Sequence, residues 1–349
     1  MAMAEPRKTS VPAPTWVERI PAAWWVLALL LVTMPAWAND FILFQVMGWT
    51  FILGIIALSL MFLAGYGGMV SLIQMSVAAM GGYMVAIFGS SGAELSMGLP
   101  WWLYLPIAIV VAAIFGTIVG ALAVRTEGIY TIMITLAIAA AFFYFTRQNY
   151  TIFNGYSGFN LVVPPQLFGV DWRQPVPFFY LTLGCAVLCY GAVAYVSRAP
   201  FGLALQGVRD NPRRMAALGF NVTAHRVAAY TFASVIASIG GILLVWQNAQ
   251  IAPGTAGIPA VIDILVIAVV GGISRPIGAF IGALIYVLLR TFSPDVLLAF
   301  DLSGERFKLL IGLGFLAVVF FSPDGVLGLW ERWRNRRARR GDPLTGEGE

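Results

Sequence analysis

The chain contains almost none of the residues that build catalytic or metal sites. Histidine occurs once, at His225, and cysteine twice, at Cys185 and Cys189. The two cysteines lie four residues apart in an apolar run and lack the further ligands of a zinc site, so we interpret them as packing residues. No G-x-x-x-x-G-K-[ST] phosphate-binding loop occurs, and ATP hydrolysis by this chain is not expected. The sequence therefore predicts no enzyme, no metal and no cofactor.

Charged residues are also scarce. They make up 11% of the 349 residues, and hydrophobic residues make up 60%, whereas about a quarter of the residues in soluble domains are charged. The apolar runs approach the 20 or so residues that a transmembrane helix needs, and they lack the alternation typical of a membrane β-barrel. We therefore predict an all-α, polytopic integral membrane protein with about ten helices. The expected helices lie near residues 22–38, 41–63, 69–89, 101–124, 128–146, 177–197, 227–247, 258–272, 276–292 and 306–322.

The basic residues predict how these helices are oriented. Arginine and lysine in short loops mark the cytoplasmic side of a membrane, and the loop at 198–226 holds five arginines. Both ends of the chain are basic and the predicted helix count is even, so both termini are expected in the cytoplasm. The loops expected outside carry acidic residues and span 90–100, 147–176 and 293–305. The longest of them, at 147–176, is either a lid or docking surface or an ordinary connector.

Three segments follow from this arrangement. Residues 1–21 are expected to form a cytoplasmic N-terminal segment, residues 22–325 the transmembrane domain, and residues 326–349 a basic cytoplasmic tail. We interpret the arginines of the tail as an orientation signal rather than a nucleic-acid patch.

The first apolar run follows basic residues and ends in Ala36-Trp37-Ala38, a pattern similar to a signal peptide with its cleavage site. We favour a retained first helix. The charged leader is long, and a second apolar run follows at once.

Glycine and polar residues interrupt two of the apolar runs. Gly65-Tyr66-Gly67-Gly68 precedes Ser71 and Gln74, and a second glycine cluster follows Asp263. A helix broken at such glycines exposes backbone groups to a solute in transporters, but glycines that only let helices pack closely give the same pattern. Ser71 and Gln74 fit either interhelical hydrogen bonds or a pore wall. Asp263, an ionisable residue inside a span, either faces a solute path, lies near the membrane interface or caps the start of its helix.

The predicted cytoplasmic loop reads as two helices with a break at Asn211-Pro212. Asparagine followed by proline is typical of a helix start, with Asn211 as the N-cap and Pro212 as the first helical residue. Gly219 is a candidate for the position after the helix end. The short helix between them either sits in a groove on a partner or is a surface helix with no partner. We interpret His225, at the membrane edge of this loop, as an interfacial side chain.

At this loop the sequence resembles the LivM-type permeases of the branched-chain amino-acid ABC importers, whose coupling loop carries a degenerate relative of the EAA signature. The resemblance covers roughly residues 41–325. The matching stretches are Phe201-Gly202, Arg209-Asp210-Asn211, Ala216 to Gly219 and Asn221-Val222 in the loop, and Gly65 to Leu72, Gly81-Gly82-Tyr83, Arg125 to Tyr130, Thr135-Leu136, Val269 to Ile273 and Pro276 to Ala279 elsewhere.

The resemblance implies the LivM/LivH-like permease fold and a complex in which different chains supply the path, the energy and the solute. The protein would form the translocation path and pair with a second homologous permease, two cytoplasmic ATP-binding subunits and an external solute-binding protein in the bacterial inner membrane. The loop around Pro212 would be the coupling helix that seats in an ATPase groove. The implied coupling residues are Gly202, Arg209, Asp210, Asn211, Pro212, Arg213, Met215, Ala216 and Gly219. The candidates for the translocation path are Gly65, Tyr66, Gly68, Ser71, Gln74, Tyr130, Thr135 and Asp263.

Two departures from the family pattern leave alternatives open. Ile73-Gln74-Met75 stands where the family often has a small or histidine-containing run, and Arg214-Met215-Ala216 has no glutamate at the EAA-like position. Branched-chain amino acids are therefore the expected solutes, with urea and short amides as the alternative. An ATP-independent secondary transporter is the competing class, for which Asp263 would be the one clear ion-coupling candidate.

Overall fold

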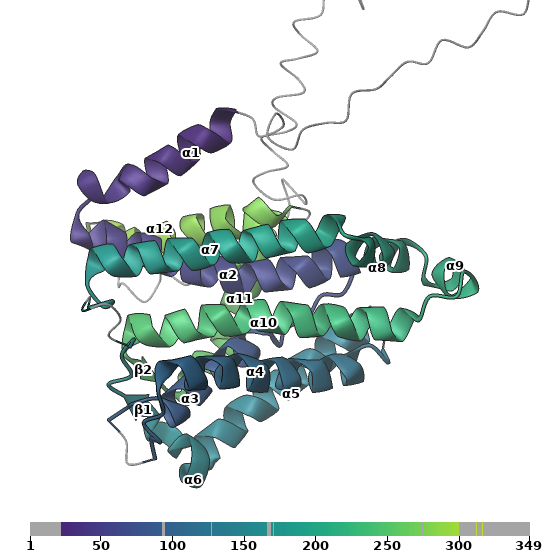
Figure 1. Cartoon of the computed structure of the whole chain (residues 1–349), viewed down its shortest axis with the longest axis horizontal. Coiled ribbons are helices and arrows are strands. Elements are labelled where there is room, and N and C mark those ends of the chain that lie inside the picture. Colours follow the sequence, from purple (N-terminus) through teal and green to yellow (C-terminus); the bar gives the residue numbers. More distant parts are fainter. Residues whose placement is uncertain are drawn as a thin grey trace, which may run out of the picture.

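The described part of the chain is almost entirely helical (Figure 1). The computed structural model describes residues 22–299 apart from 93–94, 127, 166–168, 170 and 274, together with residues 312 and 316. In chain order the elements are α1 (Ala22–Thr33), η1 (Met34–Ala36), η2 (Ile42–Gly48), α2 (Trp49–Met61), η3 (Phe62–Tyr66), α3 (Gln74–Phe88), α4 (Trp101–Ala123), α5 (Ile129–Gln148), α6 (Tyr150–Phe153), η4 (Gly155–Ser157), β1 (Phe159–Asn160), α7 (Pro175–Arg198), α8 (Pro200–Asp210), α9 (Pro212–Ala217), α10 (Val222–Asn248), β2 (Gln250–Ile251), η5 (Pro253–Ala256), α11 (Ile258–Gly271) and α12 (Pro276–Ala299).

The long helices lie side by side, and the short elements gather at the two ends of the bundle. In Figure 1, α8 and α9 lie at one end, and the two-stranded sheet lies at the other. The sheet pairs β1 with β2 antiparallel, with Phe159 opposite Ile251. It ties the connection after α6 to the end of α10, which are far apart in the chain.

Five helices are long and apolar enough to cross a membrane within the described residues, and a sixth crossing results if α11 and α12 together form one. The five are Ile42–Tyr66, Trp101–Ala123, Ile129–Gln148, Pro175–Arg198 and Val222–Asn248. The polytopic helical fold is thus confirmed, whereas the expected count of about ten spans is not.

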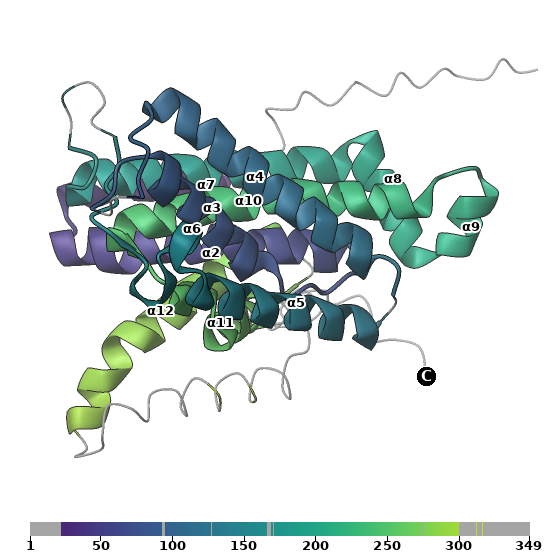
Figure 2. The same cartoon turned by 90° about the horizontal axis from the view of Figure 1, so that it is seen from below.

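The difference has a physical cause in the broken runs. The run expected at 69–89 forms α3, which has 15 residues and is about 22 Å long at 1.5 Å per residue, short of the roughly 30 Å hydrocarbon core. The runs expected at 258–272 and 276–292 form two helices bent by 116° at Gly272 and its neighbours, and Figure 2 shows α12 turning away from the other helices. The helix expected at 306–322 lies outside the described residues apart from two positions.

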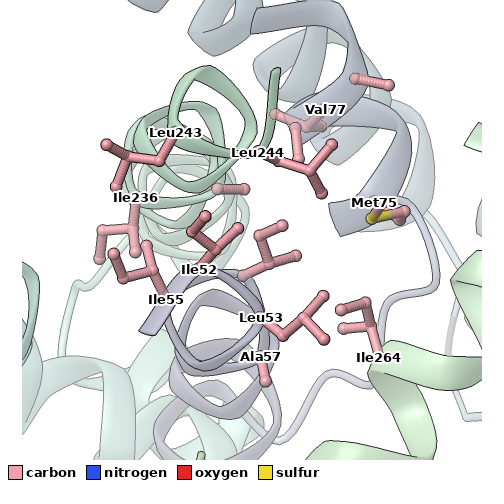
Figure 3. Close-up of a cluster of buried hydrophobic side chains, with 14 of the residues drawn as sticks. Ile52, Leu53, Ile55, Ala57, Met75, Val77, Ile236, Leu243, Leu244 and Ile264 are labelled. Carbon is pink, nitrogen blue, oxygen red and sulfur yellow. The ribbon is translucent and has the colours of Figure 1, made fainter. Parts of the chain in front are cut away.

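The span that contains α2 is the centre of the bundle. Of its most apolar window, 89% is buried inside the protein, compared with 67% for α10 and 28% for α4 and for α5. Figure 3 shows the packing: Ile55 of α2 lies beside Ile236 of α10, Leu53 of α2 lies beside Ile264 of α11, and Leu244 of α10 points toward Val77 of α3. Helices in lipid associate through such van der Waals packing rather than by the hydrophobic effect. The poorly buried faces of α4 and α5 are therefore the surfaces available to lipid or to partner chains.

Close glycine contacts let these helices approach. A Cβ at Gly241 of α10 would lie 1.9 Å from the carbonyl oxygen of Ala78 in α3, and one at Gly271 would lie 1.9 Å from that of Gly278. For the glycine cluster after Asp263, the structure thus supports close helix packing, one of the two interpretations of the sequence.

Candidate functional site

The chain leaves the helical conformation between α2 and α3, and the last residues of this break, 71–73, are buried. The span that begins at Ile42 ends in the π-helical turn η3, and Gly68 has a φ of +67°. The backbone N–H of Met69 then donates back to the Leu63 carbonyl, at 3.0 Å. Helical geometry resumes at Gln74, so about seven residues of non-helical backbone run between the two helices. The buried backbone groups of this segment need partners, because neither lipid nor an apolar interior offers any.

Side chains from four helices surround this break. The Leu72 N–H donates to the Thr135 hydroxyl of α5 at 3.1 Å, and the Ser59 hydroxyl of α2 donates to the Gln74 amide oxygen at 3.1 Å. Tyr230 of α10 places its hydroxyl near that of Ser71. We call these five residues, Ser59, Ser71, Gln74, Thr135 and Tyr230, the break cluster. All of them are fully or almost fully buried.

The break cluster offers both donors and acceptors of hydrogen bonds. Serine, threonine and tyrosine hydroxyls can do either, and the glutamine amide carries one acceptor and two donors. The Gln74 amide nitrogen and the Ser71 and Tyr230 hydroxyl oxygens are buried and have no hydrogen-bond partner within the described structure. A polar group without a partner is costly in a buried site, so these three groups are the ones of the cluster with unused hydrogen-bonding capacity.

The Thr135 hydroxyl can be tested by removing it. Thr135→Val leaves the buried Leu72 N–H without its acceptor, and we expect the free energy of unfolding to fall by about 1–3 kcal/mol. Thr182→Val is the matched control, since its equally buried hydroxyl donates only to carbonyls of its own helix, Phe178 and Phe179. Denaturation of the purified protein in detergent would compare the two. Equal losses would show that the bond to Leu72 contributes nothing of its own.

The structure brings together some of the predicted path residues and separates others. Ser71, Gln74 and Thr135 meet in the break cluster, and Gly65, Tyr66 and Gly68 lie at its η3 side. Tyr130 is 66% exposed at the start of α5. Sequence reasoning missed Ser59 and Tyr230, because a single serine or tyrosine in an apolar run gives no local signal of what it faces.

Asp263 lies beyond the first turn of α11, which has no acidic residue in that turn and no side-chain cap. The interpretation of Asp263 as a helix cap is therefore wrong. Its carboxyl instead hydrogen-bonds the Tyr286 hydroxyl of α12. The residue thus links the two arms of the broken α11–α12 pair.

The second candidate region is the helical elbow formed by α8 and α9. As predicted, Asn211 caps α9: its side-chain oxygen accepts from the Arg214 N–H at 2.9 Å. Gly219 has a φ of +89°, and the Phe220 N–H donates back to the Met215 carbonyl at 3.1 Å, which confirms the predicted helix end. None of the residues of α9 is buried. In both views α9 is the outermost helix at its end of the bundle (Figures 1 and 2).

The elbow is fixed firmly to the bundle at its α8 side. The Gln206 amide nitrogen donates to the Ser197 carbonyl at 3.0 Å, across the junction between α7 and α8. The His225 ring of α10 stacks on Phe201 with ring centroids 5.8 Å apart, and Phe220 meets the same ring edge-on. His225 thus packs between the elbow and α10, and its place at the membrane edge stays a prediction.

Within the described residues, no group of three or more His, Cys, Asp or Glu side chains is arranged to hold a metal ion. The two cysteines lie on α7 as free thiols, Cys189 buried and Cys185 half-buried. What the two candidate regions offer is a buried polar break and an exposed, capped helix.

Comparisons with known proteins identify the family that the sequence resembles. Residues 42–319 match the family model described as "Branched-chain amino acid transport system / permease component". Over 296 residues the chain is 24% identical to the high-affinity branched-chain amino acid transport system permease protein LivM of Salmonella typhimurium. That match covers 78% of this chain and 65% of the relative, just under two thirds of its length.

Two more distant relatives have names that give another solute or none. The inner membrane ABC transporter permease protein YjfF of Escherichia coli is 22% identical over 90% of this chain and 91% of its own length. The ribose import permease protein RbsC of Haemophilus influenzae is 23% identical over 71% of this chain and 76% of its own length. No solved structure matches this chain.

Proposed function

Because this chain belongs to the family of branched-chain amino acid transport permease components, we propose that it is the membrane-spanning subunit of an ATP-driven importer. It would form the path for branched-chain amino acids together with a second, homologous permease. Two cytoplasmic ATP-binding subunits would supply the energy, and an external solute-binding protein would deliver the solute. Both termini and the α8–α9 elbow would lie on the cytoplasmic side of the bacterial inner membrane.

The main observation in favour of this proposal is the exposed helix α9 of the elbow. A six-residue helix that is capped at both ends, buries none of its residues and stands at the edge of the bundle contributes little to the core of its own chain. Such a helix is suited to lie in a groove on another protein. In the proposed importer it seats in the ATPase, with Pro212, Arg213 and Ala216 on its docking surface and Asn211 and Gly219 setting its ends, while Met215 holds it against Gly207 of α8.

The break cluster supports the proposal that this chain forms the translocation path. Transporters use interrupted helices to expose polar groups to a solute near the middle of the membrane. The hydroxyl and amide groups of Ser71, Gln74 and Thr135 can bond the polar parts of a small solute. This chemistry suits branched-chain amino acids and equally suits urea or short amides, while a sugar like that of the ribose permease relative offers hydroxyls to the same groups.

Replacement of residues 212–219 by an eight-residue Gly-Ser linker tests the coupling role. We expect the variant to lose co-purification with the candidate ATPases and ATP-driven uptake into proteoliposomes, with leucine, urea and ribose as the probes. Uptake by the wild-type protein without any ATPase would contradict the importer and favour a secondary transporter. ATPase binding that survives the linker would contradict the assignment of the elbow.

A single substitution at an exposed residue tests docking to the ATPase separately from folding. Leu218→Glu places a charge on the end of the elbow, and Ile129→Glu is the matched control, because both side chains are 67% exposed. Ile129 begins α5, where an acidic side chain is favourable. We expect Leu218→Glu alone to weaken ATPase binding, by about tenfold if one apolar anchor is lost.

A further inference from the structure

Arg209, in the last turn of α8, connects the elbow to the end of the central span. Its guanidinium donates from Nη1 to the carbonyl oxygen of Gly65, the fourth residue of η3. The same side chain bonds the Asp210 carboxylate through Nε at 2.9 Å. Around this contact, a Cβ at Gly68 would lie 2.5 Å from the Arg209 Cγ, and buried Leu205 of α8 lies beside Gly67. The end of α8 is thus seated against the start of the break.

The carbonyl that Arg209 contacts belongs to a helix end. The last four carbonyls of a helix have no partner within the helix, and a basic side chain can bond them and complement the negative end of the helix dipole. A hydrogen bond from a charged donor is stronger than one between neutral groups. Arg209 therefore fixes the geometry of the turn from which the chain enters the break.

The two helices of the elbow are held together at their junction. Met215 of α9 packs on Gly207 of α8, where its sulfur lies 2.9 Å from the position of a Cβ. Asn211 joins the two helices without a gap, and its N–H donates to the Gly207 carbonyl at 2.9 Å. A displacement of α9 would consequently displace the end of α8 and Arg209 with it.

On its other side, Gly65 touches the turn of the second broken helix. A Cβ at Gly65 would lie 2.7 Å from the carbonyl oxygen of Ile273, which follows the end of α11. Gly65 is thus placed between Arg209 and the bend that joins α11 to α12. Both interruptions of the bundle, the one after η3 and the one after α11, meet at this residue.

We propose that Arg209 is a positioning residue that transmits the movement of the α8–α9 elbow to both broken helices through the Gly65 carbonyl. This inference rests on the proposed function, since it supposes that an ATPase moves α9. It assigns to Arg209 a role inside this chain rather than on the surface that meets the ATPase. Loss of the contact would leave the ATPase bound and active but disconnected from the path.

The test uses the full complex in proteoliposomes and measures three quantities: ATPase co-purification, ATP hydrolysis, and solute uptake per ATP hydrolysed. For Arg209→Ala we expect binding and hydrolysis to stay near the wild-type values while uptake per ATP falls at least about fivefold, the lower end of typical coupling between sites. Arg209→Lys keeps a cation that can reach the carbonyl and is expected to retain more of the uptake. Arg198→Ala, which removes an exposed arginine at the end of α7, is the control.

A second pair of variants reaches the same contact without touching the arginine. Gly68→Ala places a methyl group against the Arg209 Cγ, whereas Gly128→Ala meets nothing within 4 Å at nearly the same backbone angle, +61° against +67°. Both substitutions carry the strain of a positive φ, and Gly128, with a ψ of −126°, also lies outside the left-handed helical region. A loss of uptake per ATP in Gly68→Ala alone is therefore the sign of a displaced Arg209. We expect Gly68→Ala to behave like Arg209→Ala, and Gly128→Ala to keep uptake per ATP.

The outcomes separate this inference from the function on which it rests. If wild-type uptake needs no ATPase, the proposed function itself fails. If wild-type uptake is ATP-driven but Arg209→Ala keeps its uptake per ATP, the transmitting role is wrong. If Arg209→Ala instead loses ATPase binding, Arg209 belongs to the docking surface, and the inference is overturned.

Discussion

Gly241→Ala is expected to prevent most of the protein from folding. The added methyl group would lie 1.9 Å from the Ala78 carbonyl oxygen and 2.4 Å from its carbon, so a rotamer change cannot relieve the clash. Overpacking a well-packed interior costs about 1–3 kcal/mol, and a collision with backbone at this distance is expected to exceed that range. A large part of the 5–15 kcal/mol that stabilises a typical protein would be lost. Thermal unfolding in detergent and the monodisperse yield would measure the effect.

The control for this substitution is Gly184→Ala on α7. A Cβ at Gly184 meets nothing within 4 Å, and alanine is favoured over glycine in a helix by up to about 1 kcal/mol. Gly184→Ala should therefore match or slightly exceed the wild-type stability. If both variants were equally stable, the close approach of α10 to α3 would not be a feature of the folded protein.

The sequence predicted the kind of fold better than the number of its crossings. Few charges and long apolar runs are sufficient to predict a helical membrane protein, because lipid leaves the backbone few other options. Where a helix breaks depends on contacts between distant residues. The Leu72 N–H can leave helical geometry because Thr135, 63 residues away, accepts its hydrogen bond, and no property of the run at 69–89 shows that partner.

The same distinction applies to the two candidate regions. The ends of α9 were predictable because a cap is local: Asn211 bonds a residue three positions ahead, and Gly219 adopts the positive φ itself. Ser71 and Gln74 stood out as polar residues in an apolar run. The bond from Arg209 to Gly65 joins residues 144 positions apart, so only the folded structure shows that the elbow and the break belong together.

Gly271→Ala is expected to open the hairpin between α11 and α12. Its methyl group would lie 1.9 Å from the Gly278 carbonyl oxygen and 3.1 Å from the Gly282 nitrogen, so one helix must move away from the other. Because Phe280 of α12 fills the space beside Gly54 of α2, that movement also loosens the packing of α12 on the central span. We expect the midpoint of thermal unfolding to fall by at least about 5 °C, as for a loss of a few kcal/mol in a protein of this size class.

Gly254→Ala is the matched control for the hairpin. Gly254 lies in η5, just before α11, and a Cβ there meets nothing within 4 Å. Its midpoint should stay near that of the wild type. A Gly271→Ala midpoint equal to that of Gly254→Ala would contradict the tight hairpin. In the proposed importer the hairpin also holds Ile273 against Gly65. Gly271→Ala molecules that still fold should therefore import less solute per ATP, because Gly65, which Arg209 is proposed to move, no longer contacts the bend between α11 and α12.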